Sequence, residues 1–468
     1  MHTVQEQRLK REKAPKKKRT IRSFKYRIYP NKIVTQRLEW TLEECRRLYI
    51  AALSDRDASY RSMRVVPIDD NDNPIDFFTY ALTQSGDYTR IKIDPGAERV
   101  PVGKYVQSRK LTIAKRELRP EWKQITDHVL RDVLDRVDRA YQDFFRRCKK
   151  RKEGEKAGYP HFPGKDRFNS FRFPDSSGWK FETFADRPKK ANLALSNIGD
   201  IKVEFHRPYE GELRQCIIER EVDHWYCVLV CSVEARVLPV SYEDVGLDLG
   251  VKVFAAKSDG EFIENPRMYR NSEEKLKDLQ RSIANKKNKK SNRRKKIVTQ
   301  IGRLHRHIRN QRQDFLHKES TKLIKRYQII ALEELSTKKM MRRPKPKLDE
   351  QTGQFLPNGA SLESGLHKSI ADAGWFGFTQ MVVYKGKRAG RDVRLVDPAN
   401  TSQMCSACLQ FPCVHCKHAH KDAVQTCQSC GEPRAKELSD RWHSCSCGCE
   451  LDCDTNAAIN VLRLGLTT

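Results

Sequence analysis

The sequence predicts a multidomain protein of mixed α+β and α/β class, and three observations support this prediction. The chain has 468 residues, enough for about three domains of ordinary size. Segments that alternate apolar and polar residues, as strands do, are grouped apart from segments with helical spacing. Ten of the fifteen cysteines fall between Cys405 and Cys453, which indicates a separate metal-binding region rather than a disulfide scaffold.

The charge of the chain indicates a polyanionic partner. The formal net charge is +30 at pH 7, and between Arg281 and Gln313 thirteen Lys and Arg residues occur without one acidic residue. A membrane is a competing polyanion, but the sequence has no apolar run of about 18–20 residues. Residues 1–21 are basic and have no apolar stretch of the kind a secretory signal needs. We therefore expect nucleic acid as partner, no membrane contact, and a location in the bacterial cytoplasm, associated with the nucleoid.

The first half of the chain contains both helical and strand patterns. Residues 22–30 alternate like a strand and precede a helix that Thr35 is placed to cap. A loop-rich segment, 59–101, separates it from a second helical pattern over 106–152. From 156 to 234 the period-two pattern predicts a mostly antiparallel β barrel.

A further domain begins near Asp244, where apolar strands alternate with helices. Strands are expected around Asp248, at 327–335 and at 392–398, and Ser258-Asp259-Gly260 is expected to form a hairpin turn. Helical patterns cover 272–327 and 361–390, the second with Ser361 as a possible cap. Strands separated by helices are typical of an α/β sheet.

Three acidic residues have surroundings that favour a metal site. Asp248 lies inside an apolar strand, Glu333 ends another, and Asp454 opens the helical segment DTNAAINVL. A charged group within a Val/Leu strand is costly to bury unless it is paired or bound to metal. Phosphodiester cleavage by two Mg²⁺ ions requires carboxylates from distant segments to converge. Each residue also has a simpler explanation, such as a bulge at Gly-Leu-Asp-Leu-Gly or a strand end meeting solvent.

The cysteine spacing predicts structural zinc, with one or two ions. The first assignment joins Cys427 and Cys430 with Cys445 and Cys447, because the intervening loop has the length of a zinc ribbon. The second joins Cys405, Cys408, Cys413 and Cys416. In this second site His415, His418 or His420 are alternative ligands. Separately, Cys405 and Cys408 could serve the ribbon instead. The residues without an assigned role are expected to be spectators near the site (Cys449, Cys453) or buried apolar groups (Cys45, Cys148, Cys216, Cys227, Cys231).

These segments resemble a known family. GLDLGVKVFAAKSDG, YQIIALEEL, GLHKSIADAGW, VDPANTSQMCSAC and CSCGCELDCDTNAAINVL are similar to the split RuvC motifs and zinc element of transposon-encoded TnpB nucleases, which compact type V CRISPR effectors share. RSFKYRIYP, GYPHFPGK and the HRPYEG region resemble the barrel segments of the same family. The likeness runs from about Arg22 to Leu464.

The resemblance implies a RuvC-like RNase H fold whose catalytic acids are Asp248, Glu333 and Asp454. The family commonly has Asp-Arg-Asp-x-Asn-Ala-Ala at the third acid, and here Cys453 replaces the arginine, which leaves Asp452 as an alternative ligand. It also implies an Mg²⁺-dependent endodeoxyribonuclease that uses a transposon-derived guide RNA. The target is double-stranded DNA beside a short motif that the protein reads.

The resemblance and the composition together divide the chain into five parts. These are a disordered basic arm (1–21), a β-barrel wedge domain (22–34 and 153–243), a helical recognition domain (35–152), the RuvC-like nuclease domain (244–398 and 448–468) and a zinc-binding insertion (399–447). Three other functions remain open: a compact type V CRISPR effector with an array-derived guide, a non-catalytic zinc-containing nucleic-acid-binding protein, and a DNA-strand transferase. The sequence makes no prediction about the oligomeric state.

Overall fold

The structure, a computed structural model, divides into two compact units, Met1–Glu234 and Ala235–Thr468. It describes residues 19–61, 65–67, 71, 73, 76–83, 91–93, 102–150, 157–286, 288, 291–349, 351–422, 426–431 and 441–467. The expected basic arm, up to residue 18, and most of the loop-rich segment 59–101 lie outside this part of the chain. Within it, no helix is both long and apolar enough to cross a membrane.

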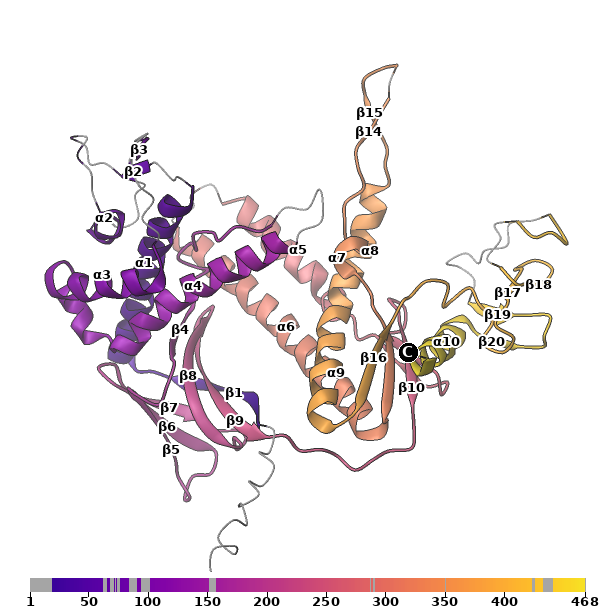
Figure 1. Ribbon diagram of the computed structural model, residues 1–468, viewed down its shortest axis with the longest axis horizontal. Helices are drawn as coiled ribbons and strands as arrows, with labels where there is room; N and C mark the ends of the chain where they lie inside the picture. Colours follow the sequence, from indigo (N-terminus) through magenta and orange to yellow (C-terminus); the bar gives the residue numbers. More distant parts are fainter. Residues whose placement is uncertain are drawn as a thin grey trace, which may run out of the picture. The chain divides into compact units, whose positions relative to one another are not determined.

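The first unit is built on a seven-stranded antiparallel sheet (Figure 1). In sheet order its strands are β4 (Ser170–Phe173), β8 (Glu212–Glu221), β9 (His224–Glu234), β1 (Arg19–Tyr29), β7 (Gly199–Glu204), β6 (Lys190–Leu195) and β5 (Trp179–Thr183). Buried residues alternate along β9, as the sequence pattern predicts. The expected antiparallel β barrel is confirmed in part, because the sheet is an open half-barrel whose edges are β4 and β5. Alternation predicts a buried face but does not determine whether a sheet closes.

Helices and one small hairpin complete the first unit. They are α1 (Lys32–Arg61), β2 (Val65–Pro67), α2 (Phe77–Thr83), β3 (Ile91–Ile93), α3 (Lys104–Glu117), the 3₁₀ helix η2 (Pro120–Gln124) and α4 (Asp127–Lys149). The helical pattern over 106–152 is thus interrupted, since Pro120 cannot continue a helix and begins η2 instead. Asn31 rather than Thr35 caps α1, and its Oδ1 accepts from the Val34 N–H at 2.9 Å.

The second unit contains a five-stranded mixed sheet (Figure 1). In sheet order its strands are β12 (Phe262–Ile263), β11 (Ala255–Lys257), β10 (Val245–Leu249), β13 (Ile329–Glu333) and β16 (Asp392–Val396). β10, β13 and β16 are parallel, whereas β11 and β12 are antiparallel to their neighbours. The expected turn at 258–260 joins β11 to β12, with Gly260 at a φ of 84°.

The remaining elements of the second unit are helices and two-stranded ribbons. They are η3 (Arg270–Ser272), α5 (Glu273–Ala284), α6 (Asn292–Arg326), α7 (Thr337–Met340), β14 (Lys347–Leu348), β15 (Phe355–Leu356), α8 (Ala360–Ala373), α9 (Trp375–Ala389), β17 (Phe411–Pro412), β18 (Ala419–His420), β19 (Trp442–Ser444), β20 (Glu450–Asp452) and α10 (Cys453–Thr467). The predicted helix over 361–390 is two helices, α8 and α9, and it begins after Gly359, so Ser361 is not its cap.

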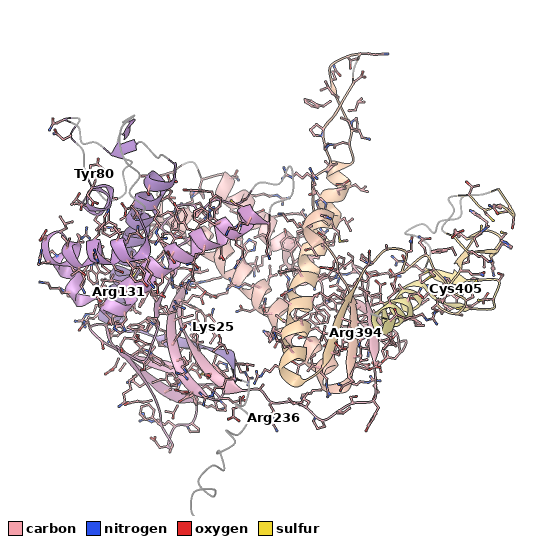
Figure 2. All side chains as sticks on the ribbon, viewed as in Figure 1. Lys25, Tyr80, Arg131, Arg236, Arg394 and Cys405 are labelled. Atoms are coloured by element: carbon pink, nitrogen blue, oxygen red, sulfur yellow. The ribbon has the colours of Figure 1, made fainter. Side chains whose placement is uncertain are left out.

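Helices cover both faces of the five-stranded sheet. Side chains of β10 and β13 share one core with α6 and α9, and Ala331 and Val396 pack with Val461 of α10 on the other face. α10 approaches β10 closely, because a Cβ on Gly246 would lie 2.1 Å from the Ala458 carbonyl oxygen. Arg394 of β16 (labelled in Figure 2) donates to the Gly465 carbonyl of α10 at 2.6 Å. α10 is therefore held beside β10, the strand that carries Asp248.

The scattered cysteines differ from one another. Cys45, Cys216, Cys227 and Cys231 are buried in the first unit, as expected. Cys148 is exposed, so its assignment as a buried apolar group was wrong. It lies near the end of α4, where the chain turns polar and basic.

Candidate metal centres

Asp248 lies within the central part of the mixed sheet. It is the fourth residue of β10, pairs in register with Ala256 of β11, and is flanked by buried Leu247 and Leu249. Burial raises the pKa of its carboxyl, and the neighbouring charges of Glu333, Asp454 and Asp452 raise it further, to about 8. Carboxyl groups from β13, β20 and the start of α10 therefore lie within electrostatic range of Asp248.

Glu333 is the last residue of β13 and is 6% exposed. The buried Thr401 hydroxyl donates a hydrogen bond of 2.6 Å to its Oε1. Burial raises the pKa of the Glu333 carboxyl, and the Thr401 hydrogen bond opposes this shift. Thr401 thus fixes the orientation of a carboxylate that has little solvent around it.

Asp454 and Asp452 have different local roles at the start of α10. Asp452 Oδ1 accepts from the N–H groups of Asp454 at 2.9 Å and of Thr455 at 3.2 Å, so Asp452 caps the helix. Asp454 lies in the first turn, and its Oδ1 is 3.6 Å from Arg441 Nη1. Burial and the charge of Asp452 raise the pKa of the Asp454 carboxyl, while Arg441 and Lys252 lower it.

The donor set of this carboxylate centre, Asp248, Glu333, Asp452 and Asp454, fits a hard divalent cation. Mg²⁺ prefers oxygen ligands and is held by a few carboxylates together with water. In the described part of the chain, no three of these carboxyl groups have oxygens that all lie within 4.8 Å of one another. Like charges repel, which favours this wider spacing, and a cation between them would offset the repulsion. The clustered negative charge is therefore consistent with the Mg²⁺ site predicted from the sequence.

Eight cysteines form two four-thiol groups. The outer cluster is Cys405, Cys408, Cys445 and Cys447, and the inner cluster is Cys413, Cys416, Cys427 and Cys430. The Sγ–Sγ distances recorded across the clusters are 3.7, 3.7, 3.7 and 3.5 Å. Four thiolates at about 2.3 Å from a tetrahedral Zn²⁺ lie roughly 3.7–3.8 Å apart, whereas a disulfide needs about 2.05 Å. The geometry fits two structural zinc sites.

The first assignment of the cysteines, which joined Cys427 and Cys430 with Cys445 and Cys447, was wrong. The alternative, in which Cys405 and Cys408 serve the ribbon, is confirmed. The pairing follows from a short hairpin. β17 and β18 are antiparallel, so the chain that carries Cys413 and Cys416 between them turns back on itself. The inner cluster is therefore nested within the loop of the outer cluster.

Neighbouring side chains also contact the clusters. His420 Nε2 lies 3.2 Å from Cys427 Sγ. Burial acts to raise the pKa of this thiol, but hydrogen bonds from His420 and from the N–H groups of Cys430 and Ser429 lower it to about 5. Cys449, expected as a spectator, instead forms a third close group with Cys405 and His443.

The outer cluster is attached to the helix that carries Asp454. Buried Asn456 of α10 accepts from the Ser406 N–H at 2.8 Å and donates to the Met404 carbonyl at 2.7 Å. Buried Asn460 donates to the carbonyls of Thr401 and Met404. Figure 2 labels Cys405, which lies between these two bonded positions in the chain. The segment 401–406 thus connects the outer cysteine cluster, α10 and the hydroxyl that holds Glu333.

Sequence reasoning missed several of these residues. Thr401, Asn456 and Asn460 act through hydrogen bonds between segments far apart in the chain, so no local pattern identifies them. Arg441 and Lys252 are two of the 91 Lys and Arg residues and have no distinguishing neighbours. The capping role of Asp452 had a signal, since an Asp immediately before a helical pattern is a common N-cap.

Two family models match this chain. OrfB_IS605, described as a probable transposase, matches residues 228–343, which include Asp248 and Glu333. The TNB domain of the Cas12f1-like type matches residues 375–424, which include the first two cysteine pairs.

Curated relatives cover more of the chain. InsQ of Escherichia coli (strain K12), named as an RNA-guided DNA endonuclease, is 30% identical over 301 residues, which are 62% of this chain and 69% of InsQ. A Streptomyces pristinaespiralis protein named in the same way is 25% identical over 346 residues, 73% of this chain and 72% of that protein. A solved complex of Cas12f1 with guide RNA and target DNA covers 95% of this chain and 99% of Cas12f1, at 12% identity. The TM-score of this match is 0.29.

Proposed function

Because this chain belongs to the TnpB family of RNA-guided DNA endonucleases, we propose that it cleaves DNA at Asp248, Glu333 and Asp454, with two Mg²⁺ ions as cofactors. In this proposal the three acids bind the two ions. A transposon-derived RNA guides the protein, and the protein reads a short motif beside the target. The RuvC-like nuclease domain would comprise 244–398 and 448–468, with the zinc-binding insertion at 399–447.

The surroundings of Asp248 carry the proposal. Its carboxyl sits in an apolar strand between two buried leucines, and three further carboxyl groups act on it. No ion pair between Asp248 and a Lys, Arg or His is recorded in the described part of the chain. Such a concentration of negative charge is costly in a folded protein unless a cation binds there.

The chain's own residues supply positioning for this reaction. When bound, the two Mg²⁺ ions activate the attacking water and stabilise the leaving oxygen. Thr401 holds the Glu333 carboxylate by its 2.6 Å hydrogen bond, and Asp452 fixes the helix turn that presents Asp454. No side-chain nucleophile is required, so we expect no covalent enzyme intermediate.

Basic side chains on α6 support a polyanionic partner. Arg293, Lys295, Lys296, Arg303 and Arg309 are exposed along this helix. Lys295, Lys296 and Arg303 line one surface hollow with three uncharged polar residues. We propose that this face contacts the phosphate backbone of guide RNA or target DNA.

Asp248→Asn tests the proposal. Asparagine keeps the size of the side chain but removes its charge, so cleavage of a matched double-stranded target should fall by roughly 1,000-fold or more. RNA binding, measured by filter retention, should not change. Retained Mg²⁺-dependent cleavage would contradict the assignment of Asp248. In a separate experiment, the RNA that co-purifies with the protein is sequenced. Its sequence distinguishes a guide made at a transposon end from a guide made from a CRISPR array.

A further inference from the structure

One tryptophan is exposed beside the carboxylate centre. The chain has six tryptophans, all among the described residues, and Trp442 is 62% exposed while the other five are buried or partly buried. Exposure of a single indole is costly, because the ring has a large apolar surface. Aromatic side chains in such positions commonly serve as stacking platforms for unpaired bases.

The strand register directs this indole toward the acids. Trp442 pairs directly with Asp452 in the β19–β20 ribbon, so their side chains share one face of it. His443, which points to the opposite face, is fully buried. Asp452 in turn caps α10 and lies within electrostatic range of Asp248 and Asp454. Trp442 therefore lies on the same side of the ribbon as the carboxylate centre.

Two cations lie near Asp454, and one of them precedes Trp442 in the chain. Arg441, the residue before Trp442, has Nη1 3.6 Å from Asp454 Oδ1, and its carbonyl accepts from the Cys453 N–H at 3.0 Å. Lys252 is exposed in the loop after β10, and its positive charge lowers the pKa of Asp454. Both cations are partly or largely exposed and can contact phosphate as well as the acids.

An exposed aromatic ring with cations in its neighbourhood is complementary to a single nucleic-acid strand. In a duplex the bases are stacked on one another, so their faces are not available to an indole. In a single strand each base has a free face, and its phosphates lie within reach of nearby Arg and Lys side chains. The distribution of charge and apolar surface around Trp442 matches this ligand better than a duplex or an apolar peptide.

We propose that Trp442, Arg441 and Lys252 form a subsite for single-stranded nucleic acid beside the carboxylate centre. The indole stacks on one base, and the two cations hold the phosphates next to it. This inference deepens the proposed function and rests on it, since the subsite would feed an unpaired strand to Asp248, Glu333 and Asp454.

Binding of a short single-stranded DNA that contains 2-aminopurine tests the subsite. The full chain carries Asp248→Asn, so that the DNA stays intact, and fluorescence reports whether a base stacks on a ring. With Trp442→Ala, the quenching should be lost and the dissociation constant should rise roughly 5- to 150-fold. Trp442→Phe should retain most of both, because a smaller ring can still stack. Phe376→Ala, which removes a comparably exposed ring from α9, is the matched control and should change neither.

A second measurement tests the cations. Arg441→Gln should reduce the slope of log affinity against log salt by about 0.7, as expected for one lost phosphate contact with a single strand. Zinc content and circular dichroism identify any variant that fails to fold. Normal quenching and affinity in Trp442→Ala, or equal losses in Phe376→Ala, would overturn the subsite and leave the nuclease proposal standing. Cleavage by the Asp248→Asn chain would overturn the catalytic assignment and leave the binding result interpretable.

Discussion

The carboxylate centre and the two cysteine clusters are assembled in opposite ways. Each cysteine cluster joins pairs that lie two or three residues apart, and its sulfur atoms already have the spacing of a zinc site. The carboxylate centre joins residues 248, 333, 452 and 454, and the charges of the other three raise the pKa of Asp248. One arrangement is short-range and preformed, whereas the other is long-range and held together against repulsion.

This difference explains why the segment between the two centres is important. The cysteine clusters fix the chain near residues 401–406, and from there Thr401, Asn456 and Asn460 reach Glu333 and α10. A centre whose own groups repel needs such external support.

The largest effect is expected at the third acid. Asp454→Asn should reduce cleavage by roughly 1,000-fold, like Asp248→Asn, if Asp454 is a metal ligand. Asp452→Asn should cost less than about 10-fold, because asparagine caps a helix as well as aspartate does. Cleavage assays over a range of Mg²⁺ concentrations measure both. The reverse order would identify Asp452 as the ligand.

A smaller but substantial effect is expected from the outer cluster. Cys405→Ser should lower zinc content and reduce cleavage by roughly 100-fold. The reason is that Cys405 lies between Met404 and Ser406, the two residues whose backbone groups are hydrogen-bonded to the Asn456 side chain. Cys430→Ser removes a ligand of the inner cluster, which lacks these bonds, and should cost less than about 10-fold. Zinc analysis and cleavage rates of both variants would separate the clusters. Equal losses would show that the two clusters act as one unit.

Next is the hydrogen bond to Glu333. Thr401→Val keeps the shape of the side chain but removes the donor, so we expect a loss of about 10–100-fold and a higher Mg²⁺ requirement. Thr401→Ser, which restores the hydroxyl, should recover most of the activity. If serine and valine were equivalent, Thr401 would contribute packing alone.

The smallest effect concerns stability. The pKa of Asp248 is about 8 in the folded chain and about 4 in an unfolded one, so the folded state binds the extra proton between these values. Stability of the zinc-loaded, Mg²⁺-free protein should therefore fall as pH rises from about 4 to about 8. In Asp248→Asn the loss of stability with rising pH should be smaller. At pH 8.5 its melting temperature should therefore exceed that of the parent, by roughly 2–4 °C for each kcal/mol of stability retained. Identical pH profiles by calorimetry would refute this coupling.

The sequence predicted much of the fold because most elements have local causes. Alternation identified β9, and the Ser258-Asp259-Gly260 turn identified the β11–β12 hairpin. Local patterns failed where the cause was a single residue, as at Pro120 and at Gly374, whose φ of 73° separates α8 from α9. They also failed where closure depended on distant strands, as in the open seven-stranded sheet. The family resemblance to TnpB is confirmed.

The site was predictable to a different degree in its two parts. The eight cysteines were identified from spacing, but their pairing was not, because either loop length is compatible with a zinc site. The three acids stood out as charges within or beside apolar segments, and β10, β13 and α10 do bring Asp248, Glu333 and Asp454 within electrostatic range. Thr401, Asn456, Asn460 and Trp442 become visible only when the segments that surround them are folded together.

The nesting of the inner cluster within the outer one has a consequence for the order of folding. The loop between Cys416 and Cys427 has ten residues, whereas the loop between Cys408 and Cys445 has 36. Closing the shorter loop costs less chain entropy, by about 1 kcal/mol. When zinc is scarce, the inner cluster should therefore fill first, and its closure then brings the distant halves of the outer cluster together. The inner site would act as an assembly aid for the site that supports Glu333 and α10.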